Sequence, residues 1–191
     1  MATTKIVNPR LIILEFRQER QDCDFGSCTW ARFYFDTTNY TLLIASDCGN
    51  YGYRWPPTPE VESFMELMSS IDAQSYLLDK ISKRNEINSE GTWTACKALI
   101  EGLYKHDITV MSNELDMDDI KDACYSSNDV HVVLAELQDC LRYTHAESIV
   151  PDGCLDECIV WDFPRYVKKI TEIFGLYIQP AIKQMLDDKN I

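Results

Sequence analysis

The sequence is poor in the residues and motifs on which enzymes depend. Only three histidines occur in 191 residues, namely His106, His131 and His145. The chain contains no GxGxxG or GxxxxGK phosphate-binding loop, no GxSxG nucleophile motif and no HExxH zinc motif. Any of the eight cysteines could pair with a histidine, but no local signature selects one. We therefore expect a protein that is not an enzyme, and a Cys/His enzyme is the third-ranked alternative.

Long apolar runs are also missing from the N-terminus. Its apolar run, from Leu11 to Leu14, has four residues, whereas a signal-peptide core needs at least about seven and a membrane span about 20. We therefore expect the protein to stay in the compartment where it is made and not to bind a membrane. Because nothing directs export, the eight cysteines are expected to be free, mostly structural thiols.

Metal-binding patterns are weak. Cys23 and Cys28 are separated by four residues and Cys154 and Cys158 by three, whereas zinc knuckles usually have two. The acidic run that starts at Asp116 resembles the start of a calcium loop, but its sixth position is a lysine and its closing position is a serine. We expect no metal and no cofactor.

Basic residues are almost absent from one window, residues 107–162. This window contains 14 acidic residues and two bases, Lys121 and Arg142, so it carries −12 of the net charge of −13. Such a field repels nucleic acid and membrane surfaces and favours basic partners.

The strongest structural pattern is an alternation of side chains between Thr29 and Trp55. Strand-favouring residues, many of them aromatic or β-branched, alternate between two faces with a period of two, and the turn-forming stretches 36–39 and 47–50 interrupt the alternation. This pattern predicts three strands, and residues 11–16 predict a fourth. Three prolines between Pro56 and Pro59 end the strand pairing.

Helical spacing dominates the rest of the chain. We expect a single α+β domain: a small N-terminal antiparallel β-meander (residues 10–56) covered by five or six helices. The helices are expected over residues 58–106, over the acidic helical region 107–162, and in a C-terminal helix over 163–191. Thr58 is the expected first N-cap, and Gly175 and Pro180 are expected to bend or break the last helix.

The acidic window is the candidate partner-binding surface. In its first helix, Ser112 or Asn113 is the expected cap, and in the next it is Asn128 or Asp129. We expect Leu115, Ile120, Val133, Leu134 and Leu137 to point inward. The carboxylates expected to point outward are Asp116, Asp118, Asp119, Asp122, Asp129, Glu136 and Asp139.

Part of the sequence resembles known small proteins. The stretch ASDCGNYGYRW, followed by ESFMELM and YLLDKISKR, is similar to uncharacterised accessory proteins of phages and prophages in Gram-positive bacteria, over about residues 40–84. The resemblance implies expression in a bacterial cytoplasm. Several phage inhibitors of restriction and CRISPR nucleases are likewise small, acidic and non-enzymatic, and some mimic DNA by presenting carboxylates where phosphates would lie.

Two functions are therefore considered. The first is a phage-encoded, non-enzymatic inhibitor that binds a basic nucleic-acid-handling bacterial protein, such as a defence nuclease, through the 107–162 surface. The alternative is a phage structural or regulatory interaction module whose acidity only serves solubility. The sequence does not define the oligomeric state.

Overall fold

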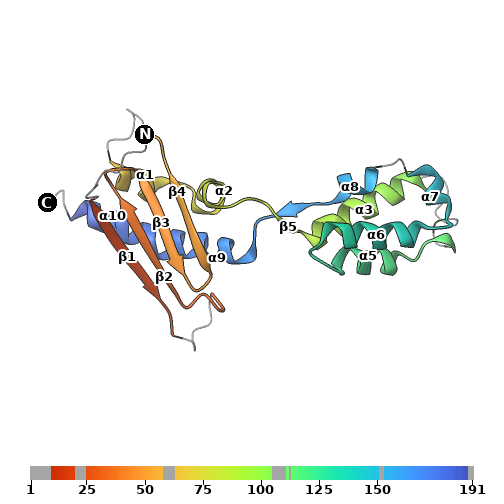
Figure 1. The fold of residues 1–191 in the computed structure, drawn as a ribbon, viewed down its shortest axis with the longest axis horizontal. Helices are drawn as coiled ribbons and strands as arrows, with labels where there is room; N and C mark the ends of the chain where they lie inside the picture. Colours follow the sequence, from red (N-terminus) through yellow and green to blue (C-terminus); the bar gives the residue numbers. More distant parts are fainter. Residues whose placement is uncertain are drawn as a thin grey trace, which may run out of the picture. The chain divides into compact units, whose positions relative to one another are not determined.

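The chain divides into two compact units, which Figure 1 shows as ribbons. The computed structural model describes residues 10–19, 25–57, 63–104, 111, 113–150 and 153–188. Residues 1–83 and 163–191 form what we call the sheet unit, and residues 84–162 form the helical unit. A single domain was the expectation from the sequence. The division arises because the buried side chains of residues 84–162 pack mainly with one another, in a hydrophobic cluster of their own.

The sheet unit is built on an antiparallel sheet in which the strands follow one another in sequence order. Its strands are β1 (Leu11–Arg17), β2 (Trp30–Asp36), β3 (Thr41–Ser46) and β4 (Gly49–Arg54). Phe33 lies opposite Ile44 and Phe35 opposite Leu42, and all four side chains are buried on one face. The predicted α+β fold with an N-terminal β-meander is confirmed.

The turn between β2 and β3 is held by the side chain of Asp36. Its carboxylate accepts hydrogen bonds from the backbone N–H groups of Thr38 and Asn39, both at 3.0 Å, and from the Asn39 side chain at 2.7 Å. The side-chain bond from Asn39 is the main reason that the pKa of Asp36 lies below its ordinary value. Tyr40 completes the turn at φ 53°, a conformation that few residues other than glycine adopt.

Helices cover the buried face of the sheet. They are α1 (Phe64–Ser70), the π-helical segment η1 (Ala73–Leu77), α2 (Leu78–Ile81), α9 (Arg165–Ile173), the π-helical segment η2 (Phe174–Ile178) and α10 (Gln179–Asp187). The Phe174 ring lies 5.8 Å from that of Phe33 and 6.4 Å from that of Phe35. The ring of Phe64, at the start of α1, lies 6.4 Å from that of Phe35. Aromatic side chains therefore join the helices to the sheet.

The first and last of these helices can be compared with the expectations from the sequence. α1 is capped by Ser63, whose hydroxyl accepts a hydrogen bond from Met65 N at 3.2 Å. The expected cap, Thr58, lies outside the described residues. Gly175 lies in η2, and Pro180 lies in the first turn of α10. The α-helical pattern is therefore interrupted by a π turn just before Pro180, whose backbone nitrogen has no hydrogen to donate. Tyr177 in η2 is 47% exposed, and its ring lies 5.0 Å from that of Phe16 and 5.8 Å from that of Phe25.

The helical unit begins and ends in a short antiparallel ribbon. β5 (Glu86–Ile87) pairs with β6 (Trp161–Asp162), so the chain enters and leaves this unit at the same place. Between them lie α3 (Ser89–Leu103), α5 (Met117–Tyr125), α6 (Val130–Leu141), α7 (His145–Ile149) and α8 (Cys154–Cys158). The helical unit is therefore an insertion in the sheet unit.

The cysteines differ from the prediction in one respect. Cys28 and Cys48 form a disulfide, with their Cα atoms 5.5 Å apart. The expectation of free thiols at these two positions was wrong, because the fold brings together two residues that lie 20 apart in the sequence. Five others, namely Cys96, Cys124, Cys140, Cys154 and Cys158, are free, and Cys23 lies outside the described residues. Among the described helices, none combines the length and apolar character needed to cross a membrane.

Candidate functional site: the acidic surface of the helical unit

The negative charge of the chain is concentrated in the helical unit. Residues 84–162 contain 17 acidic and five basic residues, whereas the rest of the chain contains 14 acidic and 13 basic residues. The helical unit thus carries −12 and the sheet unit −1. The negative charge therefore belongs to one structural unit. The sequence window 107–162 had located this charge, but not the start of the unit at residue 84.

The first part of the acidic surface is α5. Asp118, Asp119 and Asp122 are exposed, while Ile120 lies in the core at 1% exposure. Asp116 is the N-cap of this helix, and its carboxylate accepts a hydrogen bond from Asp118 N at 2.9 Å. The cap is therefore neither of the residues expected, because Asn113 belongs to an earlier helical turn and Ser112 lies outside the described residues.

The second part is α6. Asp129 is its N-cap, as one of the two predicted choices, and accepts a hydrogen bond from His131 N at 2.9 Å. Glu136 and Asp139 are exposed. Asp139 forms an ion pair with Arg142 at 2.5 Å, one turn further along the helix. Of the side chains expected to point inward, Leu115, Ile120, Val133 and Leu137 are buried and Leu134 is half-buried.

The structure brings three of the seven predicted carboxylates around one thiol. α5 packs against α6, and half-buried Cys140 lies within electrostatic range of Asp119, Glu136 and Asp139. Burial is the largest cause of the raised pKa of Cys140, and these three carboxylates raise it further. The other four residues are spread along the surface: Asp116 and Asp129 cap helices, and Asp118 and Asp122 lie one turn apart on α5.

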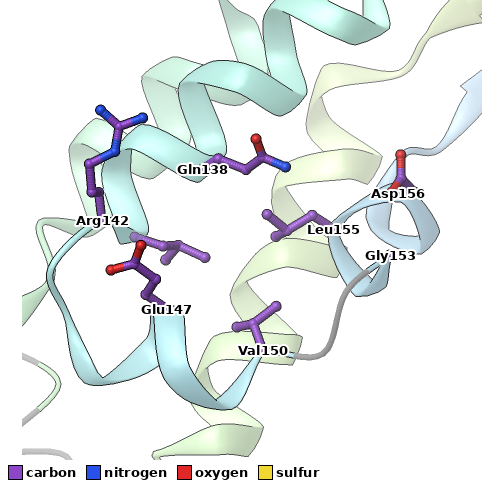
Figure 2. A pocket seen from close by; sticks show the side chains of 8 residues that line it. Gln138, Arg142, Glu147, Val150, Gly153, Leu155 and Asp156 are labelled. Atoms are coloured by element: carbon purple, nitrogen blue, oxygen red, sulfur yellow. The ribbon is translucent and has the colours of Figure 1, made fainter.

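Sequence reasoning missed a pocket of about 280 Å³ in the same unit, shown in Figure 2. Its polar lining includes Gln138, Arg142, Glu147 and Asp156, and Leu141, Val150, Gly153 and Leu155 complete it. The Arg142 guanidinium is engaged by Asp139, and the Glu147 carboxylate accepts a hydrogen bond from Tyr143 N at 2.6 Å. The lining comes from α6, α7 and α8, so no local sequence pattern could reveal it.

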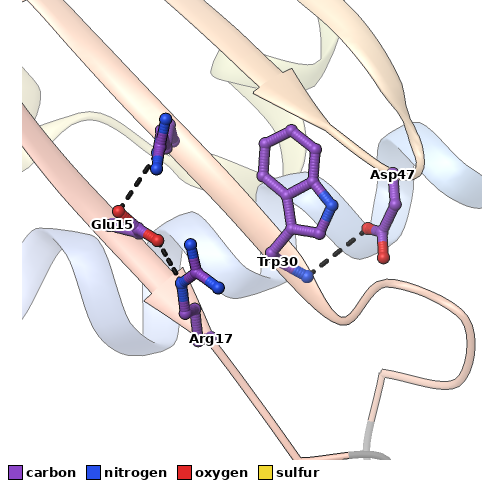
Figure 3. A network of polar contacts seen from close by, with 5 residues as sticks. Glu15, Arg17, Trp30 and Asp47 are labelled. Carbon is purple, nitrogen blue, oxygen red and sulfur yellow. Dashed lines mark hydrogen bonds and ion pairs between the residues drawn. The ribbon is translucent and has the colours of Figure 1, made fainter.

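One group of side chains has the spacing of metal ligands within the described part of the chain. It consists of Cys28, Asp47 and Cys48, whose ligand atoms lie within 4.8 Å of one another. The two sulfurs are joined as a disulfide. The Asp47 carboxylate accepts hydrogen bonds from Thr29 N at 2.9 Å and from the Thr29 hydroxyl at 2.5 Å. It also accepts one from Trp30 N at 3.4 Å, which Figure 3 shows. The disulfide and the Asp47 hydrogen bonds therefore fix the backbone of residues 28–30, where β2 begins, and have a structural role.

Comparisons with known proteins identify no similar protein. No protein family model matches the chain, and searches of characterised proteins and of solved structures find no match. The similarity to phage accessory proteins therefore stays an expectation, and function has to be argued from the physical properties of the acidic surface.

Proposed function

We propose that the helical unit is a non-enzymatic binding module that presents an acidic surface to a basic, nucleic-acid-handling protein. A bacterial defence nuclease is the partner that the resemblance to phage proteins suggests. The observation that carries the proposal is the segregation of charge: a unit of its own, with its own core, holds a net charge of −12.

The physical argument is substitution for phosphate. Grooves that bind nucleic acid are lined by lysine and arginine, which neutralise phosphates and release counterions. Asp118, Asp119 and Asp122 lie within about one turn of helix, where side chains are about 5–6 Å apart, close to the phosphate repeat along a strand. Their backbone is ordered before binding, so the carboxylates enter a basic groove without the cost of ordering a flexible chain.

The hydrogen bonds refine the list of partner-binding residues. Among the described residues, Asp118, Asp119, Asp122 and Glu136 have no side-chain hydrogen bond or ion pair, so their carboxylates are available to a partner. By contrast, Asp116 and Asp129 cap helices, and Asp139 is paired. We therefore assign the larger contribution to the first four residues.

The second candidate is an interaction module in which the acidity only keeps the protein soluble. The cap and ion-pair roles of Asp116, Asp129 and Asp139 favour this alternative, because they give three of the seven carboxylates a structural purpose. The two candidate functions make different predictions. If the acidic surface binds the partner, neutralising α5 weakens binding more than neutralising other exposed acids; if the acidity serves only solubility, the position of the lost charges does not matter.

The experiment compares two triple variants that change the net charge equally. Asp118→Asn/Asp119→Asn/Asp122→Asn alters the proposed surface. Glu66→Gln/Asp79→Asn/Glu172→Gln alters exposed positions in the sheet unit. The partner is the protein recovered by pull-down from a bacterial lysate, and its affinity is measured at two salt concentrations.

The proposal expects weaker binding and a shallower salt dependence for the α5 variant alone. Its thermal stability should be unchanged or slightly higher, since like charges one turn apart repel. Equal affinity of both variants and the wild type at both salt concentrations would support the solubility role and remove the basis of the proposal.

A further inference from the structure

Among the described residues, β1 is an edge strand with no strand paired to its outer side. It is the first strand in the order β1-β2-β3-β4. The pairing with β2 is bracketed by hydrogen bonds from Thr37 N to Arg10 O at 3.0 Å and from Gln18 N to Thr29 O at 2.9 Å. In an antiparallel ladder these groups recur every second residue, so the even-numbered residues of β1 bond to β2. The N–H and C=O groups of residues 11, 13, 15 and 17 therefore point outward, and within the described chain no hydrogen bond reaches them.

This edge is also apolar over half its length. Leu11 and Ile13 are 50% and 54% exposed. Natural edge strands usually carry charges that prevent pairing with another chain. Here the charges are confined to one end, where Glu15 forms ion pairs with Arg17 and with Arg32 of β2 (Figure 3).

The opposite edge is different. α2 packs against β4, and the Lys80 ammonium lies 5.4 Å from the centre of the Tyr53 ring. β4 also carries Gly52 and the exposed Arg54 at positions whose backbone faces outward. Glycine and charge weaken strand pairing. The β1 edge is therefore the better template for a further strand.

We propose that β1 pairs with β1 of a second copy of this chain, antiparallel and about a two-fold axis, to form a continuous sheet across a homodimer. The register that pairs all seven residues places Leu14 opposite itself and Ile12 opposite Phe16 of the second copy. These side chains lie on the core face, where Ile12 and Leu14 are only half-buried in one copy. On the other face, Ile13 lies opposite Glu15 of the second copy, so no like charges meet.

The charge of the sheet unit does not oppose pairing with a second copy. The sheet unit contains 14 acidic and 13 basic residues, so two sheet units meet almost without net repulsion. The charged side chains on β1, Glu15 and Arg17, already neutralise each other within one copy. What the edge offers is backbone hydrogen bonds and apolar side chains, which an identical edge matches.

Sedimentation analysis of the full-length protein over a range of concentrations tests the proposal. The wild type should dimerise. Ile13→Glu creates two like-charge pairs with Glu15 across the axis, and should raise the dimer dissociation constant about tenfold or more. Ile13→Lys creates two opposite-charge pairs at the same positions and should weaken the dimer less than Ile13→Glu does.

Leu43→Glu is the matched control. Leu43 is also 54% exposed and lies on the same open face, but on β3, away from the edge. This variant should dimerise like the wild type, and thermal melts should verify that all variants are folded. A wild type that stays monomeric at every concentration would overturn the proposal, as would equal weakening by Ile13→Glu and Leu43→Glu.

Discussion

Reduction of the Cys28–Cys48 disulfide should destabilise the sheet unit by up to about 3 kcal/mol. The bond joins residues 20 apart in sequence, and the chain-entropy relation gives about 3 kcal/mol for a loop of this size. Cys28 precedes β2 and Cys48 follows β3, so the bond closes the open end of the β2–β3 hairpin, opposite its turn. Its effect should therefore appear as a greater freedom of the unfolded hairpin.

The native contacts around the bond limit the loss. The Asp47 carboxylate still holds Thr29 and Trp30 through hydrogen bonds at 2.9 and 3.4 Å after reduction. Cys28 and Cys48 are 0% and 6% exposed, so the reduced thiols stay in the core as small apolar groups. The fold should survive reduction with a lower urea midpoint and an equal or slightly steeper slope, because the unfolded chain without the bond is less compact.

The measurement is a urea titration of the oxidised protein, the same protein in reductant, and a Cys28→Ala/Cys48→Ala variant. Cys154→Ala, which alters a half-exposed free thiol, is the control and should leave the midpoint almost unchanged. Peptide mapping without reductant should recover Cys28 and Cys48 in one linked pair. Eight alkylatable thiols in the unreduced protein, together with one midpoint for all samples, would refute the reasoning.

Three further predictions concern single positions and the insertion. Gly52→Ala should cost about 1–3 kcal/mol, because its added Cβ would lie 3.1 Å from the backbone oxygen of Leu42, which cannot move as the nearby Leu43 side chain can. Gly102→Ala meets nothing within 4 Å and should stabilise α3 by about 0.5–1 kcal/mol, and urea titrations measure both changes. Tyr104→Phe should lower the free energy of unfolding by about 1–3 kcal/mol, because it removes a buried hydroxyl that donates to Glu114 at 3.2 Å and accepts from Ala146 N at 3.0 Å. Tyr143→Phe is the control and should have no effect, since Tyr143 is 94% exposed. Burial raises the pKa of Tyr104, so the stability that its neutral form contributes should be present below about pH 10 and be lost as the pH rises further. The Tyr104→Phe variant should lose less stability over this pH range than the wild type. Residues 84–162 expressed alone should melt cooperatively by circular dichroism, since their ends pair in a ribbon and their core is their own; a helical but non-cooperative melt would contradict this.

The strands could be predicted from the sequence because their signal is local. Alternation of apolar side chains between Thr29 and Trp55 determines which face is buried, and the turn residues determine where pairing stops. Helix ends were harder to predict. Ser112, Asn113 and Asp116 are all good caps within five residues, and the choice among them depends on which register buries Ile120.

Long-range features could not be predicted from the sequence. No local sequence pattern around Cys28 or Cys48 indicates that they pair with each other. Their pairing follows from the register of the β2–β3 hairpin, which brings the two cysteines together. The same holds for the two units, since the pairing of Glu86 with Asp162 spans the whole insertion. For the candidate site, helical spacing gave the outward and inward positions, but not the approach of Asp119 on α5 to Cys140 on α6.

The insertion explains how the chain tolerates so uneven a charge. Like charges one turn apart, as at Asp118 and Asp122, cost about 0.2–0.5 kcal/mol per pair. Each large apolar side chain that is fully buried, such as Ile120 or Leu137, contributes about 1.5–3 kcal/mol. A few such residues in the separate core of the helical unit offset the repulsion locally, and the sheet unit does not share the cost. The acidic surface can therefore change in sequence, and so in partner, without endangering the sheet that the rest of the chain builds.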